Sequence, residues 1–418
     1  MSAREGDDAR RTADAVARRS YGKLVAFLAA RTRDVAAAED ALSEAFATAL
    51  SHWPATGCPA NPEGWLLTVA RRKLIDGVRR RQIGEAASAQ LQILVDGVED
   101  AAAKAEQHMA IPDQRLALMF ACAHPAIDVG VRAPLMLQTV LGLDARTIAS
   151  AFLASPAAMG KRLGRAKEKI REAGIPFAIP GREELRERLQ SVLDAIYAAF
   201  AEGWTDPSGK DVMRRDLTDE AIFMARLVAE LLSQEPEALG LLALVLHAEA
   251  RRSARRGQDG EYVPLEHQDP ALWNGLLIDE AEALLRRAST MNAIGRYQLE
   301  AALQSAHVHR RRSGHDNWAA VVQLYDALSA LTSSPVVAIN RALAVAELHG
   351  PQVGIEILKS IADSRFDHYQ PYWAARAELL SRTGERDEAR QAYELAIGLE
   401  HDPAVRAFLQ KRQAALGR

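Results

Sequence analysis

The stretch PEGWLLTVARRKLIDGVRRR, residues 62–81, has the pattern of an amphipathic helix. Its apolar positions recur at helical spacing: Leu67, Ala70, Leu74 and Val78. Its other face is charged: Arg72, Asp76, Arg79 and Arg80. Pro62 suits the first helical position, where its missing N–H costs nothing, and Asn61 is placed to cap the helix. The stretch therefore predicts a helix with one face for a core and one cationic face for a polyanion.

A second basic stretch, SPAAMGKRLGRAKEKIREA at residues 155–173, repeats this pattern. The predicted core stripe is Met159, Leu163, Ala166 and Ile170. The predicted outer side is Ala158, Lys161, Arg162, Arg165 and Lys169. A shorter helix is expected over 141–152, and Ser155 is placed as an N-cap before Pro156. This order predicts a helix-turn-helix that binds duplex DNA, although an isolated charged run of this kind is more often a solvated face.

Composition sets the class of protein. The chain has 418 residues, a formal net charge of −3 and helical periodicity nearly throughout, so we expect a multi-domain all-α protein. The two basic helices must then concentrate positive charge locally. Two cysteines, Cys58 and Cys122, predict no disulfide framework, and the apolar run 238–246 is too short for a membrane span. A cytoplasmic protein without a membrane anchor is expected.

Breaks in the helical pattern divide the chain. The predicted parts are a helical unit over 12–82, a linker over 83–111, a second helical unit over 112–178 and a C-terminal unit over 182–418. Residues 84–107 carry a net of four negative charges, which favours a linker. Three prolines make 54–62 a predicted helix stop.

The C-terminal unit contains a repeat near 34 residues. Its best copy is Trp373, Ala377, Leu380, Gly384, Ala389, Tyr393 and Ala396, with small residues where paired helices would touch. Pro335, Pro371 and Pro403 fall near the inter-repeat turns. This pattern predicts tetratricopeptide-like pairs over 310–403, with an irregular bundle as the alternative.

Three acids, Glu39, Asp40 and Glu44, precede the first basic helix and predict a protein-docking edge or a solvated face. No nucleophile, base and orienting group occur together, so an enzyme is the least favoured class. Cys122 and His124 are too few for a zinc site, and neither a metal nor another cofactor is expected. Trp65, beside the cations of 62–81, suits either single-strand binding or a core.

Taken together, these parts resemble a bacterial RNA polymerase sigma factor of the extracytoplasmic-function group, within the sigma-70 family. Residues 37–46 resemble region 2.2, residues 61–76 resemble regions 2.3 and 2.4, and residues 155–169 fall where region 4.2 places its recognition helix. The subgroup with a tetratricopeptide-like C-terminal extension is similar in further runs: 121–126, 166–177, 297–302, 316–318 and 334–342.

The resemblance implies promoter recognition with three sets of contacts. Core polymerase would be bound by Glu39, Asp40 and Glu44 at the β′ clamp helices, with a further contact to the β flap. The melted minus-ten element would be bound by the Gly57 loop and by Trp65, Arg71, Arg72, Lys73, Asp76, Arg79 and Arg80. The minus-35 element would be read by Ser155, Ala157, Ala158, Lys161, Arg162, Arg165 and Lys169.

The same resemblance implies that the acidic linker threads the polymerase and that the extension supplies regulation, with a protein regulator as a possible partner. Two residues depart from the family pattern. Leu153 stands in the turn where many sigma factors have Gly, and Gly160 inside the recognition helix costs about 1 kcal/mol relative to Ala.

Two other classes compete with this interpretation. A helix-turn-helix regulator with a repeat-based sensor would bind duplex DNA without joining polymerase, but it leaves the acidic edge and the linker unexplained. A tetratricopeptide scaffold would have no role for the basic helices.

Overall fold

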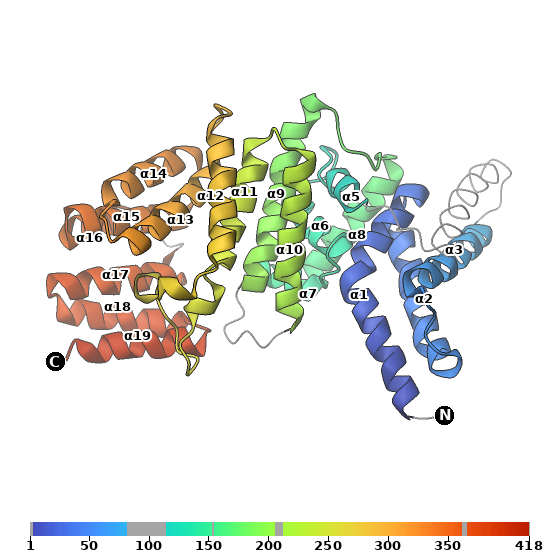
Figure 1. Ribbon diagram of the computed structural model, residues 1–418, viewed down its shortest axis with the longest axis horizontal. Coiled ribbons are helices and arrows are strands. Elements are labelled where there is room, and N and C mark those ends of the chain that lie inside the picture. The colour runs from blue at the N-terminus through green and yellow to red at the C-terminus, as the bar shows by residue number, and fades with distance from the viewer. Residues whose placement is uncertain (1–2, 82–113, 153, 205–211, 362–365, 418) are drawn as a thin grey trace. The chain divides into compact units, whose positions relative to one another are not determined.

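The computed structural model describes residues 3–81, 114–152, 154–204, 212–361 and 366–417 (Figure 1). In these ranges the chain is helical apart from loops, short 3₁₀ turns and one isolated bridge between Arg256 and Tyr262. The all-α prediction is confirmed. The described residues form two compact units, 3–204 with 212–224, and 225–417. The predicted linker over 83–111 lies outside the described residues.

Three helices open the first unit: α1 (Ala3–Thr32), α2 (Val35–Thr56) and α3 (Pro62–Arg81). Their shared core is fully buried and includes Leu24, Phe27, Leu42, Trp53 and Leu67. At the start of α3, the Asn61 side chain accepts a hydrogen bond from Gly64 N at 3.0 Å, which confirms the predicted cap. The helix stop predicted over 54–62 begins three residues late, because α2 runs through Pro54 to Thr56 and ends where Gly57 adopts φ 82°. Proline lacks a donor, but so near the helix end this does not stop the last turn.

Four further helices follow in the first unit: α5 (Arg115–Cys122), α6 (Val129–Thr139), α7 (Ala145–Ala151) and α8 (Pro156–Glu172). The helix expected over 141–152 begins only at Ala145. Gly142 has φ 69°, which breaks the helix, and Asp144 caps the new one by accepting from Arg146 N and Thr147 N at 2.8 and 2.9 Å. These two backbone bonds lower the pKa of Asp144, with burial opposing them.

Helix α9 (Arg182–Trp204) belongs to the first unit, whereas the sequence pattern grouped it with the C-terminal unit. It packs against α5 and α6 through a buried stripe that includes Leu189, Val192, Leu193 and Ile196. The proline-rich stop before α9 marks a turn inside the first unit. Helix α10 (Val212–Leu231) continues from this unit into the second.

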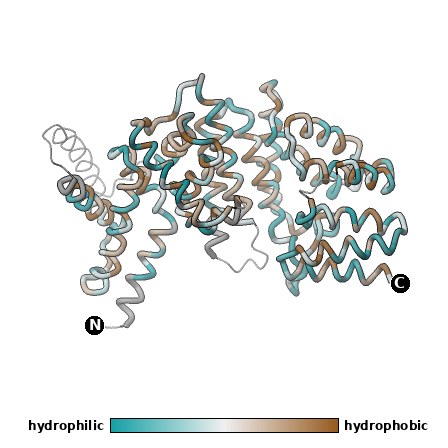
Figure 2. The backbone as a smooth tube through the Cα atoms, turned by 180° about the vertical axis from the view of Figure 1, so that it is seen from behind, coloured by the Kyte–Doolittle hydropathy of each residue, from teal (hydrophilic) through white to brown (hydrophobic). Residues whose placement is uncertain are grey.

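The second unit is a series of helices whose sequence neighbours pack in pairs. After α10 come α11 (Pro236–Glu249), α12 (Gly275–Ser289), α13 (Arg296–Ser313), α14 (Trp318–Leu331), α15 (Pro335–His349), α16 (Pro351–Ser360), α17 (Gln370–Thr383), α18 (Arg386–Leu399) and α19 (Pro403–Ala415). The 3₁₀ turns Arg252–Arg255, Leu265–His267 and Pro270–Leu272 lie between α11 and α12. Figure 2 shows polar and apolar residues alternating along these helices, as amphipathic packing requires.

Small residues lie where some helices of the second unit meet. A Cβ atom on Gly354 would lie 2.6 Å from Ala346 Cβ and 2.9 Å from Leu379 Cδ1, so α16 approaches α15 and α17 closely at this point. Ala377, Ala389 and their neighbours in the best repeat copy share one buried cluster. Helix α17 ends at Gly384, which has φ 84°.

Candidate nucleic-acid and polymerase interface

The predicted minus-ten surface is built around the start of α3. Trp65 is half-buried, stacks on His52 with ring centroids 6.1 Å apart, and meets Trp53 edge-on at 5.4 Å. Trp53 is 1% exposed and holds this cluster to the core. Trp65 is therefore a packing residue whose ring is still partly accessible at the surface. Its contact with single-stranded DNA stays a prediction.

The cations of α3 lie in different environments. Arg72 and Asp76 are exposed, whereas Arg71 and Lys73 are half-buried. Lys73 Nζ lies 2.9 Å from Glu44 Oε2, with 38% and 57% of the two side chains exposed, so this ion pair is solvated and contributes little to stability. Arg79 and Arg80 belong to α3, but their side chains lie outside the described residues.

A basic cleft of about 980 Å³ adjoins the start of α3, and the sequence pattern did not predict it. Its charged lining is Arg11, Arg19, Lys23, Glu63 and Arg115. Lys23 Nζ lies 3.8 Å from Glu63 Oε2. The cations of α1 are spread through a helix with no clear cationic face in the sequence, and only the fold brings them beside residues 60–63 at the start of α3.

The three acids of α2 do not form one exposed edge. Asp40 and Glu44 are exposed, but the Glu39 side chain is 13% exposed and its carboxylate bonds Lys167 Nζ of α8. Burial raises the pKa of Glu39, with Lys167 opposing and Asp40 adding to the effect. Glu39 is therefore mostly buried against α8 and is not part of the exposed acidic edge that the sequence predicted.

The helix-turn-helix prediction places α8 correctly. Ser155 Oγ accepts from Ala158 N at 3.3 Å and caps α8. The predicted core stripe is buried: Met159, Leu163, Ala166 and Ile170. Helix α7 packs on α8. Leu153, in the turn between them, lies outside the described residues.

The outer side of α8 carries the predicted minus-35 residues. The exposed ones are Ser155, Ala157, Ala158, Lys161, Arg165 and Lys169. Arg162 is partly engaged, because its Nη2 donates to Gly130 O at 3.2 Å and lies 3.9 Å from Asp128 Oδ1. Arg162, Arg165 and Lys169 line a surface pocket of about 400 Å³ together with residues 126–128 and Val131 at the start of α6. The face is cationic and accessible, as contacts to a phosphate backbone require.

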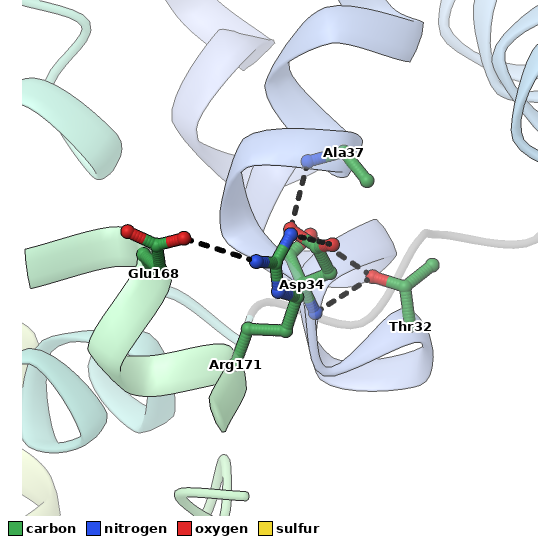
Figure 3. Close-up of polar contacts among 5 residues, drawn as sticks. All are labelled: Thr32, Asp34, Ala37, Glu168 and Arg171. Atoms are coloured by element: carbon green, nitrogen blue, oxygen red, sulfur yellow. Dashed lines mark hydrogen bonds and ion pairs between the residues drawn. The ribbon is translucent and has the colours of Figure 1, made fainter. Parts of the chain in front are cut away.

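Lys167 and Arg171 are the functional candidates that the sequence did not single out on α8. Lys167 turns toward α2, whereas Arg171 is 47% exposed and lies 3.9 Å from Asp34 at the start of that helix (Figure 3). Only charge on α8 could have indicated them, and charge alone does not show which cations face another helix.

Metal sites and membrane spans are not found in the described ranges. No group of three His, Cys, Asp or Glu residues there could hold a metal ion, and no helix there is long and apolar enough to cross a membrane. Cys58 is exposed and Cys122 is buried, and both are free thiols.

Comparison with known proteins places the chain in a family. The uncharacterized protein R00370 of Rhizobium meliloti is 38% identical over 380 residues, which cover 90% of this chain and 89% of that protein. The chain belongs to the family of R00370. No solved structure matches it.

Two segments of this R00370-family chain match described families. Residues 16–83 match sigma-70 region 2, so α1–α3 form a sigma region 2 domain, and residues 188–289 match a family of unknown function, DUF6596. A probable RNA polymerase sigma factor, RfaY of Xanthomonas campestris pv. campestris, is 32% identical over 164 residues, 36% of this chain and 40% of that protein. These matches support a sigma-factor-like role.

Proposed function

We propose that the protein is an RNA polymerase sigma factor of the extracytoplasmic-function group, which directs core polymerase to promoters in the cytoplasm and catalyses no reaction itself. The observation that carries the proposal is the sigma-70 region 2 match at 16–83, which coincides with α1–α3. These helices bring an acidic α2 beside a cationic α3, the two surfaces that polymerase docking and DNA capture need.

The surfaces of α2, α3 and α8 have separate roles in this proposal. Exposed Asp40 and Glu44 dock on the β′ clamp helices of core polymerase, with a further contact from the α7–α8 unit to the β flap. Trp65 and the cations of α3 hold the melted minus-ten element, where stacking and backbone contacts suffice. Helix α8 enters the major groove at the minus-35 element with exposed Lys161 and Arg165 on the phosphates.

The second unit regulates this activity. Its paired helices and small residues at the crossings suit a tetratricopeptide-like surface that binds a protein regulator. The segment matching DUF6596 begins in α9 and ends at the last residue of α12, so it includes parts of both units.

Binding to purified bacterial core polymerase tests the proposal. The wild-type chain is expected to co-elute with core polymerase, and the double variant Asp40→Arg with Glu44→Arg is expected to lose this binding because it reverses the docking charge. The matched control is Glu356→Arg with Glu394→Arg, which reverses two exposed acids of the second unit. Transcription start sites mapped after overexpression should share a two-element promoter.

A free-standing helix-turn-helix regulator predicts the opposite pattern. It would bind a duplex promoter fragment alone and would not bind core polymerase, and the acid reversals on α2 would have no effect. That result would overturn the sigma-factor proposal.

A further inference from the structure

The basic cleft beside the start of α3 has no part in the promoter contacts proposed above. All of its lining residues belong to the first unit, and they come from α1, α5, α10 and the start of α3. Its volume of about 980 Å³ lies at the upper end of the range for small-molecule sites, roughly 300–1,000 Å³. Four cations and one acid line it, four minus one or three positive charges, in a chain whose formal net charge is −3. The cleft therefore has the size and the charge of a site for a small anionic ligand.

Helix α1 forms one wall of the cleft with a regular stripe of side chains. The lining positions of this helix share one face: Arg11, Thr12, Ala15, Val16, Arg19, Ser20 and Lys23. With a rise of about 1.5 Å per residue, Arg19 and Lys23 are about 6 Å apart along the helix axis, and Arg11 is about 12 Å from Arg19. Arg11 and Arg19 are exposed, and Lys23 is half-buried. Arg19 and Lys23, one turn apart, are therefore placed to contact a single polyphosphate chain.

The acid Glu63 positions polar groups of this wall without occupying them fully. Its Oε1 accepts a hydrogen bond from Ser20 Oγ, and its Oε2 lies 3.8 Å from Lys23 Nζ. This ion pair is loose, because a charge-assisted hydrogen bond between an ammonium and a carboxylate is about 2.7–2.9 Å long. Since an ammonium group has three donors, Lys23 can remain beside Glu63 and still donate to a phosphate oxygen.

A phenyl ring accompanies the cations in the lining. Phe223 of α10 is 44% exposed. The guanidinium carbon of Arg115 lies 4.6 Å from the centre of this ring, and Arg115 itself bonds Glu220. The ring is thus held in place while part of its surface stays open, where a planar base can stack on it. Inorganic phosphate would not use the ring and an apolar ligand would not use the cations, so the lining favours a ligand with both phosphates and an aromatic base.

We propose that the cleft binds a free nucleotide, with its phosphates on Arg19 and Lys23 of α1 and its base beside Phe223. Arg11 extends the cationic wall along α1 beyond these two contacts. Because the nucleotide contacts α1 and α10 together, its binding stabilises the folded first unit by mass action. The site goes beyond the proposed sigma-factor function and does not depend on it.

Isothermal titration calorimetry of the free full-length protein tests the site. The probes are ATP, GTP, CTP and UTP, with tripolyphosphate as the ligand that lacks a base and the matching nucleosides as ligands that lack phosphates. At least one nucleotide should bind at a single site, and more tightly than tripolyphosphate or its nucleoside. Absence of binding by every nucleotide, or equally tight binding of tripolyphosphate, would overturn the proposal.

Two variants separate the phosphate contacts from the base contact. Arg19→Ala removes an exposed cation and should weaken nucleotide affinity roughly 10- to 150-fold, as loss of one charge-assisted hydrogen bond does. Phe223→Ala should weaken nucleotide affinity but leave tripolyphosphate affinity unchanged. The matched controls are Lys359→Ala, an exposed cation of the second unit, and Leu231→Ala, an exposed apolar residue of α10 outside the lining, and both should bind like wild type. Wild-type nucleotide affinity in Arg19→Ala would contradict the assignment.

A thermal measurement and a competing ligand complete the test. The nucleotide should raise the melting temperature of wild type but not that of Arg19→Ala, which should melt like wild type without nucleotide because its side chain is exposed. If a short single-stranded oligodeoxynucleotide binds and depends on Arg19 while no free nucleotide binds, the cleft holds a DNA strand and the proposal is wrong. None of these measurements uses core polymerase, so their failure leaves the sigma-factor proposal intact, and failure to bind polymerase leaves the nucleotide site intact.

Discussion

His247 in α11 shows how one buried side chain links stability to pH. It is 0% exposed, neither ring nitrogen has a hydrogen-bond partner among the described residues, and Glu282 Oε1 lies 3.4 Å from its Nε2. Burial, followed by the charges of Arg251 and Arg312, lowers its pKa to about 4. His307 in α13 likewise has its pKa lowered to about 4, first by burial. Both rings are therefore neutral in the folded protein above about pH 4.

Acid should destabilise the second unit before its carboxylates titrate. An unfolded histidine has a pKa near 6.5, so between pH 6.5 and 5 the unfolded chain binds more protons and folding stability falls as pH falls. The expected loss is about 2 kcal/mol per buried histidine over this window. Urea unfolding of His247→Phe should show a shallower pH slope than wild type, whereas His349→Phe, at an exposed site, should not. Identical slopes in all three proteins would refute this assignment.

Two glycines at helical positions have opposite surroundings. An added Cβ on Gly160 in α8 meets nothing within 4 Å, so Gly160→Ala should raise the free energy of unfolding by about 0.5–1 kcal/mol. Gly354→Ala places its Cβ 2.6 Å from Ala346 Cβ and should lower stability by about 1–3 kcal/mol through overpacking. Calorimetry of both variants checks the signs. Destabilisation by Gly160→Ala would mean that the exposed face of α8 has a partner in the free protein.

Helix α8 could be predicted because its N-cap and the spacing of its apolar residues are both contained in one short stretch of sequence. Ser155 and the stripe from Met159 to Ile170 fix its start and its buried face, and both lie where the sequence placed them. Its contact with α2 was not predictable, since Lys167 and Glu39 are 128 residues apart and an ion pair leaves no periodic signal. The continuation of α2 through Pro54 and the start of α7 only at Ala145 were not predicted. Each depends on local backbone geometry that the periodic pattern does not encode.

The outer face of α8 should determine the salt dependence of DNA binding. Lys161→Ala with Arg165→Ala removes two exposed cations, so the slope of log affinity against log salt should become shallower by about 0.9 for each phosphate that these cations neutralise. Titration of a duplex promoter fragment by the polymerase-bound protein measures this slope. Lys359→Ala is the control, with an unchanged slope expected. A slope unaffected by the α8 variant would show that this face does not bind phosphates.

The division of the whole chain was the hardest feature to predict. A proline- and glycine-rich turn at 174–181 has the composition of a domain boundary, yet α9 returns to pack on α5 and α6. Arg115 of α5 also bonds Glu220 of α10, so the first unit extends past the apparent boundary. Composition shows where the backbone turns, but only side-chain packing shows which core the next helix joins.

Truncations after different helices test this division and the role of the second unit together. A chain ending at residue 180 exposes the faces of α5 and α6 that α9 buries, and should aggregate or unfold without cooperativity. A chain ending at Leu231 keeps α9 and α10, and should unfold cooperatively. A change in transcription between the full chain and the fragment ending at Leu231 therefore reports regulation by the second unit. Loss of transcription by the fragment ending at residue 180 reports misfolding instead. Equal unfolding midpoints for the two fragments would show that α9 contributes nothing to the first unit.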